Sequence, residues 1–318
     1  MQTVIVTGGS GFIGSHLCEK LLAMEYRVVC VDNLLTSSEG NIAHLKNNPS
    51  FRFVHHNVIT PLPGDLSAEY VFHLASPASP NHHSDISYHK LPMETMQVNT
   101  TGTLELLKFC EKHSAKFLFA STSEIYGDPL VHPQKETYNG NVSTTGPRSV
   151  YDEAKRFGET ITAYFGRERN VDTRIIRIFN TYGPRMNKAD MRMIIVFITQ
   201  ALKGEEITIF GDGQQTRSLC YISDTLDGMI RLMFGDNTKG EIVNIGSPEE
   251  HTVLEFATIV KELVGSQSKI VFSEKLPEDD PKMRKADIQK AKALLGWEPH
   301  VTLEVGLEKM IEYFKTNT

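Results

Sequence analysis

Tyr151 and Lys155 stand four residues apart, and the triplet Thr122, Ser123 and Glu124 lies upstream of them. Positions i and i+4 share one face of a helix, so the Lys155 ammonium can lie near the Tyr151 hydroxyl. A free tyrosine has a pKa of about 10, and a nearby cation lowers it by favouring the phenolate. The same spacing arises by chance in many helices. With a hydride acceptor nearby, however, it predicts that Tyr151 removes a proton from a substrate hydroxyl.

A glycine-rich turn near the N-terminus predicts a site for such an acceptor. A short β-branched run at residues 4–6 leads into Gly8, Gly11 and Gly14, and leucines follow at helical spacing. Strand, glycine turn and helix form a dinucleotide-binding fingerprint, because the backbone can approach a pyrophosphate at the helix N-terminus. A second predicted strand ends at Asp32. This acid can accept hydrogen bonds from both ribose hydroxyls and would repel a 2′-phosphate, so we expect NAD in preference to NADP.

Composition excludes several classes of protein. Of the 318 residues, 40% are hydrophobic and 23% are charged, as in ordinary globular proteins. A net charge of −6 without a long basic run argues against a nucleic-acid partner. No apolar run approaches the roughly 20 residues of a membrane span, and a glycine turn beginning at residue 8 leaves no room for a signal peptide. The paired histidines lack a metal-ligand pattern and the four cysteines are far apart. We therefore expect a cytoplasmic enzyme with reduced cysteines, no metal and no membrane partner.

Alternating strands and helices predict an α/β fold, a Rossmann-type doubly wound parallel sheet with a smaller C-terminal α/β substrate-binding lobe. We expect an NAD-binding domain at residues 1–180 and the second lobe mainly at 181–318, with elements near 220–246 returning to the first sheet. Residues 207–213 look like part of a hairpin. After the first two strands, strand patterns occur at 51–55, 70–74, 116–121 and 173–179, and helical patterns at 99–113 and 150–167.

The carboxyl ends of parallel strands meet at one edge of a sheet, so residues after them should converge on one cleft. The predicted cofactor-binding residues are Gly8, Gly11, Phe12, Ile13, Gly14, Asp32, Asn33, Asn57, Val58, Leu74, Ala75, Ser76, Asn99, Tyr151 and Lys155. Arg217 follows a Gly-Asp-Gly turn and suits a bidentate contact with a diphosphate. For each arginine the alternative is a solvated charge or a structural ion pair.

Nearly the whole chain resembles a known family, the extended short-chain dehydrogenase/reductase enzymes that modify nucleotide sugars, and within it the UDP-glucuronate decarboxylases. The matching segments are LASPASP at 74–80, ASTSEIYGDP at 120–129, YDEAKR at 151–156, RIFNTYGPR at 177–185, SPEEHTVLEF at 247–256 and DDPKMRKAD at 279–287. Glu124 is informative, because related dehydratases usually show Asp-Glu after the threonine and 4-epimerases a small residue where Glu124 stands. The resemblance implies tightly bound NAD and a homodimer joined through helices.

The resemblance also implies a reaction, namely conversion of UDP-glucuronate to a UDP-pentose such as UDP-xylose. Tyr151, with its pKa held down by Lys155, would remove the 4-hydroxyl proton while Thr122 orients that hydroxyl. The resulting 4-keto acid would lose CO₂, and C4 would then be reduced again. Glu124 would act near C5 and C6, Arg284 would contact the carboxylate, and Ser123 would either assist or brace the strand end. The predicted substrate-binding residues are Pro77, Asn180, Arg185, Arg192, Arg217 and Arg284.

Two departures from the family pattern leave the sugar open. The loop at residues 81–93 is longer than expected, and Asn57 replaces an aspartate that usually follows the third strand. An amide can still bind an adenine edge, so NAD is retained, while the loop leaves room for an N-acetylated hexuronate. The alternatives are a nucleotide-sugar 4-epimerase or 4,6-dehydratase on the same scaffold, and an NAD-sensing protein without turnover.

Overall fold

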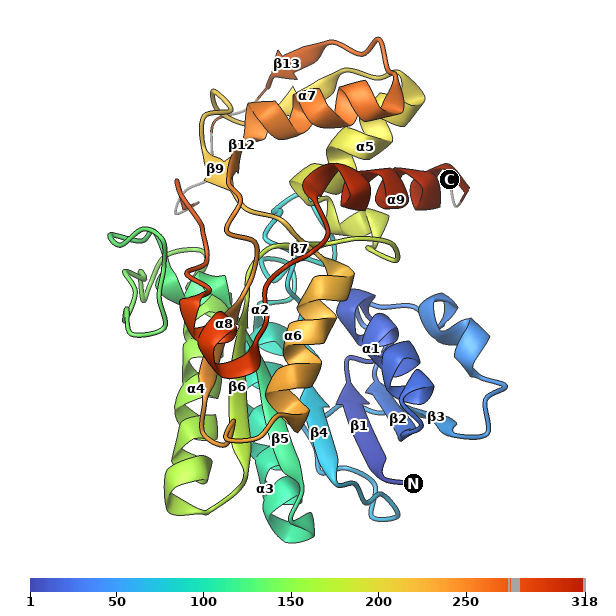
Figure 1. Cartoon of the computed structure of the whole chain (residues 1–318), viewed down its shortest axis with the longest axis vertical. Helices are drawn as coiled ribbons and strands as arrows, with labels where there is room; N and C mark the ends of the chain where they lie inside the picture. Colours follow the sequence, from blue (N-terminus) through green and yellow to red (C-terminus); the bar gives the residue numbers. More distant parts are fainter. Residues whose placement is uncertain (274, 276–280, 317–318) are drawn as a thin grey trace.

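The core of the protein is a seven-stranded sheet in which every neighbouring pair of strands is parallel (Figure 1). The computed structural model describes residues 1–273, 275 and 281–316. The sheet has the order β11-β6-β5-β4-β1-β2-β3. Its strands are β1 (Thr3–Thr7), β2 (Arg27–Asp32), β3 (Phe51–His55), β4 (Tyr70–His73), β5 (Lys116–Thr122), β6 (Thr173–Ile178) and β11 (Ile242–Ile245). Continuous β-branched and aromatic runs such as Val4 to Val6 are fully buried, as a sheet covered on both faces requires.

Helices cover both faces of this sheet. On one face, α1 (Phe12–Ala23) packs against α6 (Ile222–Phe234), and α8 (Gln289–Leu295) lies beside α6 and β11. On the other face, α3 (Thr103–His113) and α4 (Ser149–Glu168) pack together, with α2 (Pro92–Gln97) against α4. The predicted helix at 99–113 begins with a π-helical turn, Val98–Gly102. The predicted Rossmann-type sheet is therefore confirmed. From the second half of the chain, β11 joins the sheet, and α6 and α8 pack against it.

A smaller lobe stands above the carboxyl ends of the strands in Figure 1. Its helices are α5 (Met193–Lys203), α7 (Val253–Val264) and α9 (Leu303–Thr316), and its short strand pairs are β7 (Thr181–Tyr182) with β10 (Cys220–Tyr221), β8 (Ile207–Ile209) with β13 (Ile270–Phe272), and β9 (Thr216–Arg217) with β12 (His251–Thr252). The expected hairpin at 207–213 is wrong, because β8 pairs in parallel with the distant β13. The Gly211 to Gly213 turn leads instead to β9, whose antiparallel partner is β12.

The order of the strands determines where a ligand can bind. From β1 the chain proceeds outward through β2 and β3, whereas β4, β5 and β6 extend in the opposite direction. In such sheets the ligand site lies outside the carboxyl ends of the strands, at the point where the direction reverses. The glycine turn follows β1, and the single-turn 3₁₀ helix Ser123–Tyr126 follows β5. Both therefore lie at the same edge of the sheet, beneath the smaller lobe.

Candidate active site

A cavity of about 740 Å³ lies between the sheet edge and the smaller lobe. All but one of the predicted cofactor-binding, catalytic and substrate-binding residues line it. The exception is Asn99, which is fully buried and donates hydrogen bonds from Nδ2 to Ser76 Oγ at 2.9 Å and to the Thr95 carbonyl at 2.8 Å. Asn99 thus holds the Ser76 side chain by a hydrogen bond without lining the cavity itself. Among the described residues, no group of three or more His, Cys, Asp or Glu side chains could hold a metal.

The glycine turn leaves no room for side chains at its tightest points. A Cβ atom on Gly14 would lie 2.1 Å from the Gly8 carbonyl oxygen, and one on Gly8 would lie 2.8 Å from the Ala75 backbone. Gly8 also has φ +70°, a conformation that L-residues rarely adopt. Asp32 is held at the end of β2, where its carboxylate accepts hydrogen bonds from the Ser10 and Leu34 amides at 2.9 and 2.8 Å. This arrangement fits a dinucleotide, with the pyrophosphate at the turn and a ribose at Asp32.

Tyr151 and Lys155 lie on one face of α4, as predicted, but the pKa shift of Tyr151 differs from the expectation. Lys155 Nζ donates to the Ala120 carbonyl at 2.8 Å and lies 5.8 Å from the centroid of the Tyr151 ring. Burial raises the pKa of Tyr151, Glu124 raises it further, and a hydrogen bond with Thr122 opposes the increase. Burial also lowers the pKa of Lys155, to about 7. The predicted lowering of the tyrosine pKa is therefore wrong for this structure, because the loss of hydration outweighs the hydrogen bond with Thr122 and the charge of Arg192.

Glu124 is the centre of a buried charge cluster. Arg284 donates two hydrogen bonds to its carboxylate, at 2.6 and 2.8 Å, and Arg148 donates a third at 2.5 Å. Each of the three residues is at most 8% exposed. Burial alone would raise the pKa of Glu124, but the charges of Arg148 and Arg284 lower it to about 2. The predicted neighbours Glu124 and Arg284 are thus brought together. Asp279 and Asp280, from the segment that suggested Arg284, lie outside the described residues.

Two residues of this region were missed by sequence reasoning. Arg148 lies one helical turn before Tyr151, so its i, i+3 spacing could have signalled a shared face. Tyr88 stacks on Tyr151, with ring centroids 4.9 Å apart and an interplanar angle of 10°, and Arg148 lies 6.0 Å from the Tyr88 ring centroid. No local pattern in the 81–93 loop indicates this contact. Tyr88 is 1% exposed and forms the wall behind Tyr151.

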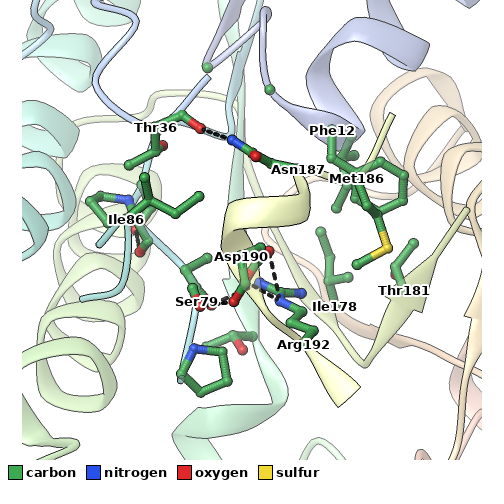
Figure 2. Close-up of a pocket in the computed structure, with 18 of the residues that line it drawn as sticks. Phe12, Thr36, Ser79, Ile86, Ile178, Thr181, Met186, Asn187, Asp190 and Arg192 are labelled. Carbon is green, nitrogen blue, oxygen red and sulfur yellow. Dashed lines mark hydrogen bonds and ion pairs between the residues drawn. The ribbon is translucent and has the colours of Figure 1, made fainter. Parts of the chain in front are cut away.

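The loop before α2, residues 74–91, is hydrogen-bonded to the segment that leads into α5 (Figure 2). Ser79 Oγ donates to the Asp190 carbonyl at 2.7 Å, and Ser84 Oγ donates to the Ala189 carbonyl at 2.5 Å. Arg192 forms an ion pair with Asp190 at 3.1 Å and donates to the Ala78 carbonyl at 2.8 Å, so it braces the loop as well as lining the cavity. The loop therefore connects the sheet edge to the smaller lobe across the cavity.

The remaining predicted substrate residues divide between the two ends of the cavity. Arg185 forms an ion pair with Glu19 of α1 at 2.5 Å, which places it on the glycine-turn side. Arg217, in β9, donates to the Thr216 carbonyl at 2.8 Å and lines the smaller-lobe side. Pro77 and Asn180 line the cavity after β4 and β6. Further lining residues of the smaller lobe that the sequence did not single out are Thr208, Phe210, Gln215, Leu219 and Val253.

Comparison with known proteins agrees with this geometry. A family model described as "NAD dependent epimerase/dehydratase family" matches residues 4–246. The UDP-glucuronic acid decarboxylase 1 of Xenopus tropicalis is 45% identical over 99% of this chain and 72% of its own length. The UDP-glucuronic acid decarboxylase 6 of Arabidopsis thaliana is 48% identical over 98% of this chain and 88% of its own length.

Solved structures share the whole fold. The UDP-glucuronic acid 4-epimerase from Bacillus cereus, in complex with UDP-glucuronic acid and NAD, is 31% identical with a TM-score of 0.87, covering 99% of this chain and 100% of that one. The UDP-glucose 4-epimerase of Thermotoga maritima is 33% identical with the same TM-score, over 99% of each chain. The chain described here therefore belongs to the NAD-dependent epimerase/dehydratase family, the extended short-chain dehydrogenases/reductases.

Proposed function

We propose that this protein is an NAD-dependent UDP-glucuronate decarboxylase that forms a UDP-pentose such as UDP-xylose. The observation that carries the proposal is the buried carboxylate of Glu124, bonded to Arg148 and Arg284 beside Tyr151. Similarity to UDP-glucuronic acid decarboxylases over 98–99% of this chain supports it. The site offers a base for a hydroxyl and cations for a carboxylate, which are the two groups that a decarboxylation through a β-keto acid requires.

Oxidation at C4 is assigned to Tyr151, Thr122 and Lys155. When bound, NAD accepts a hydride from C4 and later returns it. As the hydride leaves, the 4-hydroxyl becomes strongly acidic, which favours proton transfer to Tyr151. Thr122, whose hydrogen bond lowers the pKa of Tyr151, holds the hydroxyl group in line. Lys155 supplies positive charge behind the tyrosine, where its ammonium lies 5.8 Å from the ring centroid.

Loss of CO₂ is assigned to the cluster around Glu124. The C6 carboxylate of the 4-keto sugar is β to the carbonyl, so the electrons left at C5 delocalise onto the C4 oxygen. The Tyr151 hydroxyl then donates a hydrogen bond to that oxygen, as an oxyanion-hole donor does. Arg148 and Arg284 orient the carboxylate before it leaves, and the negative charge of Glu124 favours release of the uncharged product. Ser123 is a further donor at the same strand end, and a water molecule held beside Glu124 would give C5 its proton.

We assign the nucleotide to the smaller-lobe end of the cavity. Arg217 would contact the diphosphate, and Phe210 and Gln215 would bind the uracil, because an aromatic face and an amide suit a flat, hydrogen-bonding base. Arg192, Asn180 and Pro77 line the same cavity and would border the sugar. Arg185 lies with Glu19 near the glycine turn, so its proposed contact is with the diphosphate region shared by both ligands.

We also infer a homodimer through α3 and α4, and a cytoplasmic location. Phe157 and Tyr164 of α4 are 48% and 45% exposed, and Ile161 lies between them on the same helical face. An exposed apolar stripe of this kind marks an interface. Light scattering of wild type and Tyr164→Glu tests the dimer, and an unchanged dimer in the variant would refute it.

The proposed cytoplasmic location rests on the cysteines, all four of which are buried and free, as in a reducing compartment. In the part of the chain that the structure describes, no helix has the length and apolarity needed to cross a bilayer.

Incubation with UDP-glucuronate tests the function directly. We expect CO₂ and a UDP-pentose, with a transient absorbance of reduced cofactor. A C4-inverted UDP-hexuronate formed without CO₂ would instead assign a 4-epimerase, the activity named for the Bacillus cereus neighbour. UDP-N-acetylglucosaminuronate as a second substrate tests whether the long 81–93 loop accommodates a larger sugar acid. Absence of turnover on both substrates would refute the proposal.

A further inference from the structure

Asp152 is a buried acid beside the active site to which the proposed reaction gives no role. It follows Tyr151 in the first turn of α4 and is 5% exposed. Its Oδ1 atom has no hydrogen-bond partner in the described part of the chain. A buried carboxylate without such a partner is costly, because its charge loses hydration without compensation. A neutral carboxylic acid is better accommodated at this position.

The arrangement of the neighbouring cations explains why Asp152 lacks a partner. Asp152 lies one helical turn after Arg148, and its amide donates to the Arg148 carbonyl at 3.1 Å. The Arg148 guanidinium nevertheless extends to Glu124, at 2.5 Å, and Arg284 donates twice to the same carboxylate. Glu124 therefore accepts hydrogen bonds from both guanidiniums, whereas Asp152 Oδ1 accepts none among the described residues.

The electrostatic surroundings agree with this geometry. Burial raises the pKa of Asp152 to about 8, and Glu124 and Glu153 add to the increase, whereas Arg148 and Arg284 oppose it. Tyr88 and His89, from the loop before α2, Tyr151, on the same helix, and Arg192, at the start of α5, also act on the cluster. Burial raises the pKa of both tyrosines, so neither ionises in the range where Asp152 does.

We propose that Asp152 stays protonated at neutral pH and that this neutral acid makes the pocket selective for a sugar acid over a neutral sugar. With Asp152 neutral, the cluster around Glu124, Arg148 and Arg284 carries one negative charge fewer than with Asp152 ionised, which favours binding of the carboxylate of a nucleotide-linked hexuronate. Ionisation of Asp152 adds that negative charge and weakens the preference. Asp152 is thus a specificity-determining positioning residue that does not itself line the cavity. The inference rests on the proposed function, because it takes a hexuronate as the ligand.

Binding of two ligands to the NAD-loaded enzyme tests this role. The dissociation constants of UDP-glucuronate and UDP-glucose are measured at about pH 6.5 and about pH 9, on either side of the range where Asp152 titrates. The ratio of the two constants removes effects on the nucleotide, which both ligands share, and comparison of wild type with Asp152→Asn removes the effect of Lys155, whose pKa of about 7 lies in the same range. In wild type we expect the preference for UDP-glucuronate to fall roughly tenfold as the pH rises, the scale of one added charge in a partly buried site.

Variants separate the role of Asp152 from a purely structural one. Asp152→Asn, which imitates the neutral acid, should retain the wild-type preference at about pH 6.5 and lose much less of it at about pH 9 than wild type does. Glu153→Gln is the matched control, since Glu153 is the adjacent acid with a 38% exposed side chain, and it should follow wild type. A wild-type preference that does not change with pH, or an Asp152→Asn preference that falls as in wild type, would overturn the inference.

The outcomes also distinguish this inference from the proposed function. Release of CO₂ with a pH-independent preference would refute the role of Asp152 and leave the decarboxylase intact. A preference that falls as expected without release of CO₂ would support the role of Asp152 in a sugar-acid site of another enzyme. If Asp152→Asn does not fold, Asp152→Ser, which also lacks the charge, takes its place in the same comparison.

Discussion

Two walls of the same cavity are assembled over very different lengths of chain. The cofactor wall consists of the glycine turn and the ends of β1, β2 and β4. Within the turn, Gly14 lies so close to Gly8 that a Cβ atom on Gly14 would overlap the Gly8 carbonyl oxygen. The substrate wall consists of the Glu124 cluster and the loop before α2. Its contacts join residues as far apart as Glu124 and Arg284, 160 positions along the chain, and Ser79 and Asp190, 111 positions apart. A short motif can therefore specify the first wall, whereas the second exists only once both lobes have folded.

Tyr151→Phe should have the largest effect, because Tyr151 stands where the two walls meet. Loss of the hydroxyl removes the group that transfers the C4 proton, so kcat should fall by about 10²–10⁴-fold. Binding of UDP-glucuronate should change little, since the stacked ring remains. Steady-state kinetics and ligand titration measure the two quantities. Tyr164→Phe, on the exposed side of the same helix, is the control. A wild-type kcat in Tyr151→Phe would remove this residue from the chemistry.

Gly14→Ala should break the cofactor wall alone. The new Cβ would lie 2.1 Å from the Gly8 carbonyl oxygen, so the turn has to move away from the pyrophosphate site. We expect the NAD affinity to fall by about 100-fold, while UDP, which we assign to the smaller lobe, should keep its affinity. Titration with each ligand measures the difference. Gly64→Ala is the matched control, because a Cβ there meets nothing within 4 Å. Equal losses for NAD and UDP would show that the walls are not independent.

Glu124→Gln should damage the substrate wall in activity and in stability together. The release of CO₂ should slow by about 10–100-fold, with NAD binding unchanged, because only the charge facing the sugar acid is lost. The pKa of Glu124 in the folded protein is about 2, below its usual value, so its charge stabilises the wild type above about pH 4.5. That contribution disappears as the pH falls from about 4.5 toward 2. Thermal unfolding should therefore show a smaller acid dependence in the variant, and an identical dependence would contradict the assignment.

Ser84→Ala should give the smallest effect. The change removes the hydrogen bond from Ser84 Oγ to the Ala189 carbonyl, one of the contacts that fasten the loop across the cavity. One such bond contributes about 1 kcal/mol, so we expect KM for UDP-glucuronate to rise about fivefold with little change in kcat. Ser87→Ala is the control, because Ser87 Oγ has no partner among the described residues. Similar kinetics for the two variants would show that the loop does not depend on this contact.

The sequence by itself determined the elements and the motifs that depend on neighbouring residues. Periodicity located the parallel strands, and the glycine turn with Asp32 indicated the dinucleotide site, because each feature is a matter of local backbone geometry. The spacing of Tyr151 and Lys155 likewise predicted a shared helical face. Glu124 and Arg284 were found through resemblance to a family, since no local pattern joins residues so far apart.

Only the tertiary structure decided the environment of those residues. It paired β8 with β13 in place of a hairpin, stacked Tyr88 on Tyr151, and added Arg148 to the Glu124 cluster. It also reversed the expected pKa shift of Tyr151, because burial removes hydration to an extent that spacing along a helix cannot reveal. Hydration and long-range packing depend on what surrounds a side chain in three dimensions, and that information is complete only in the folded chain.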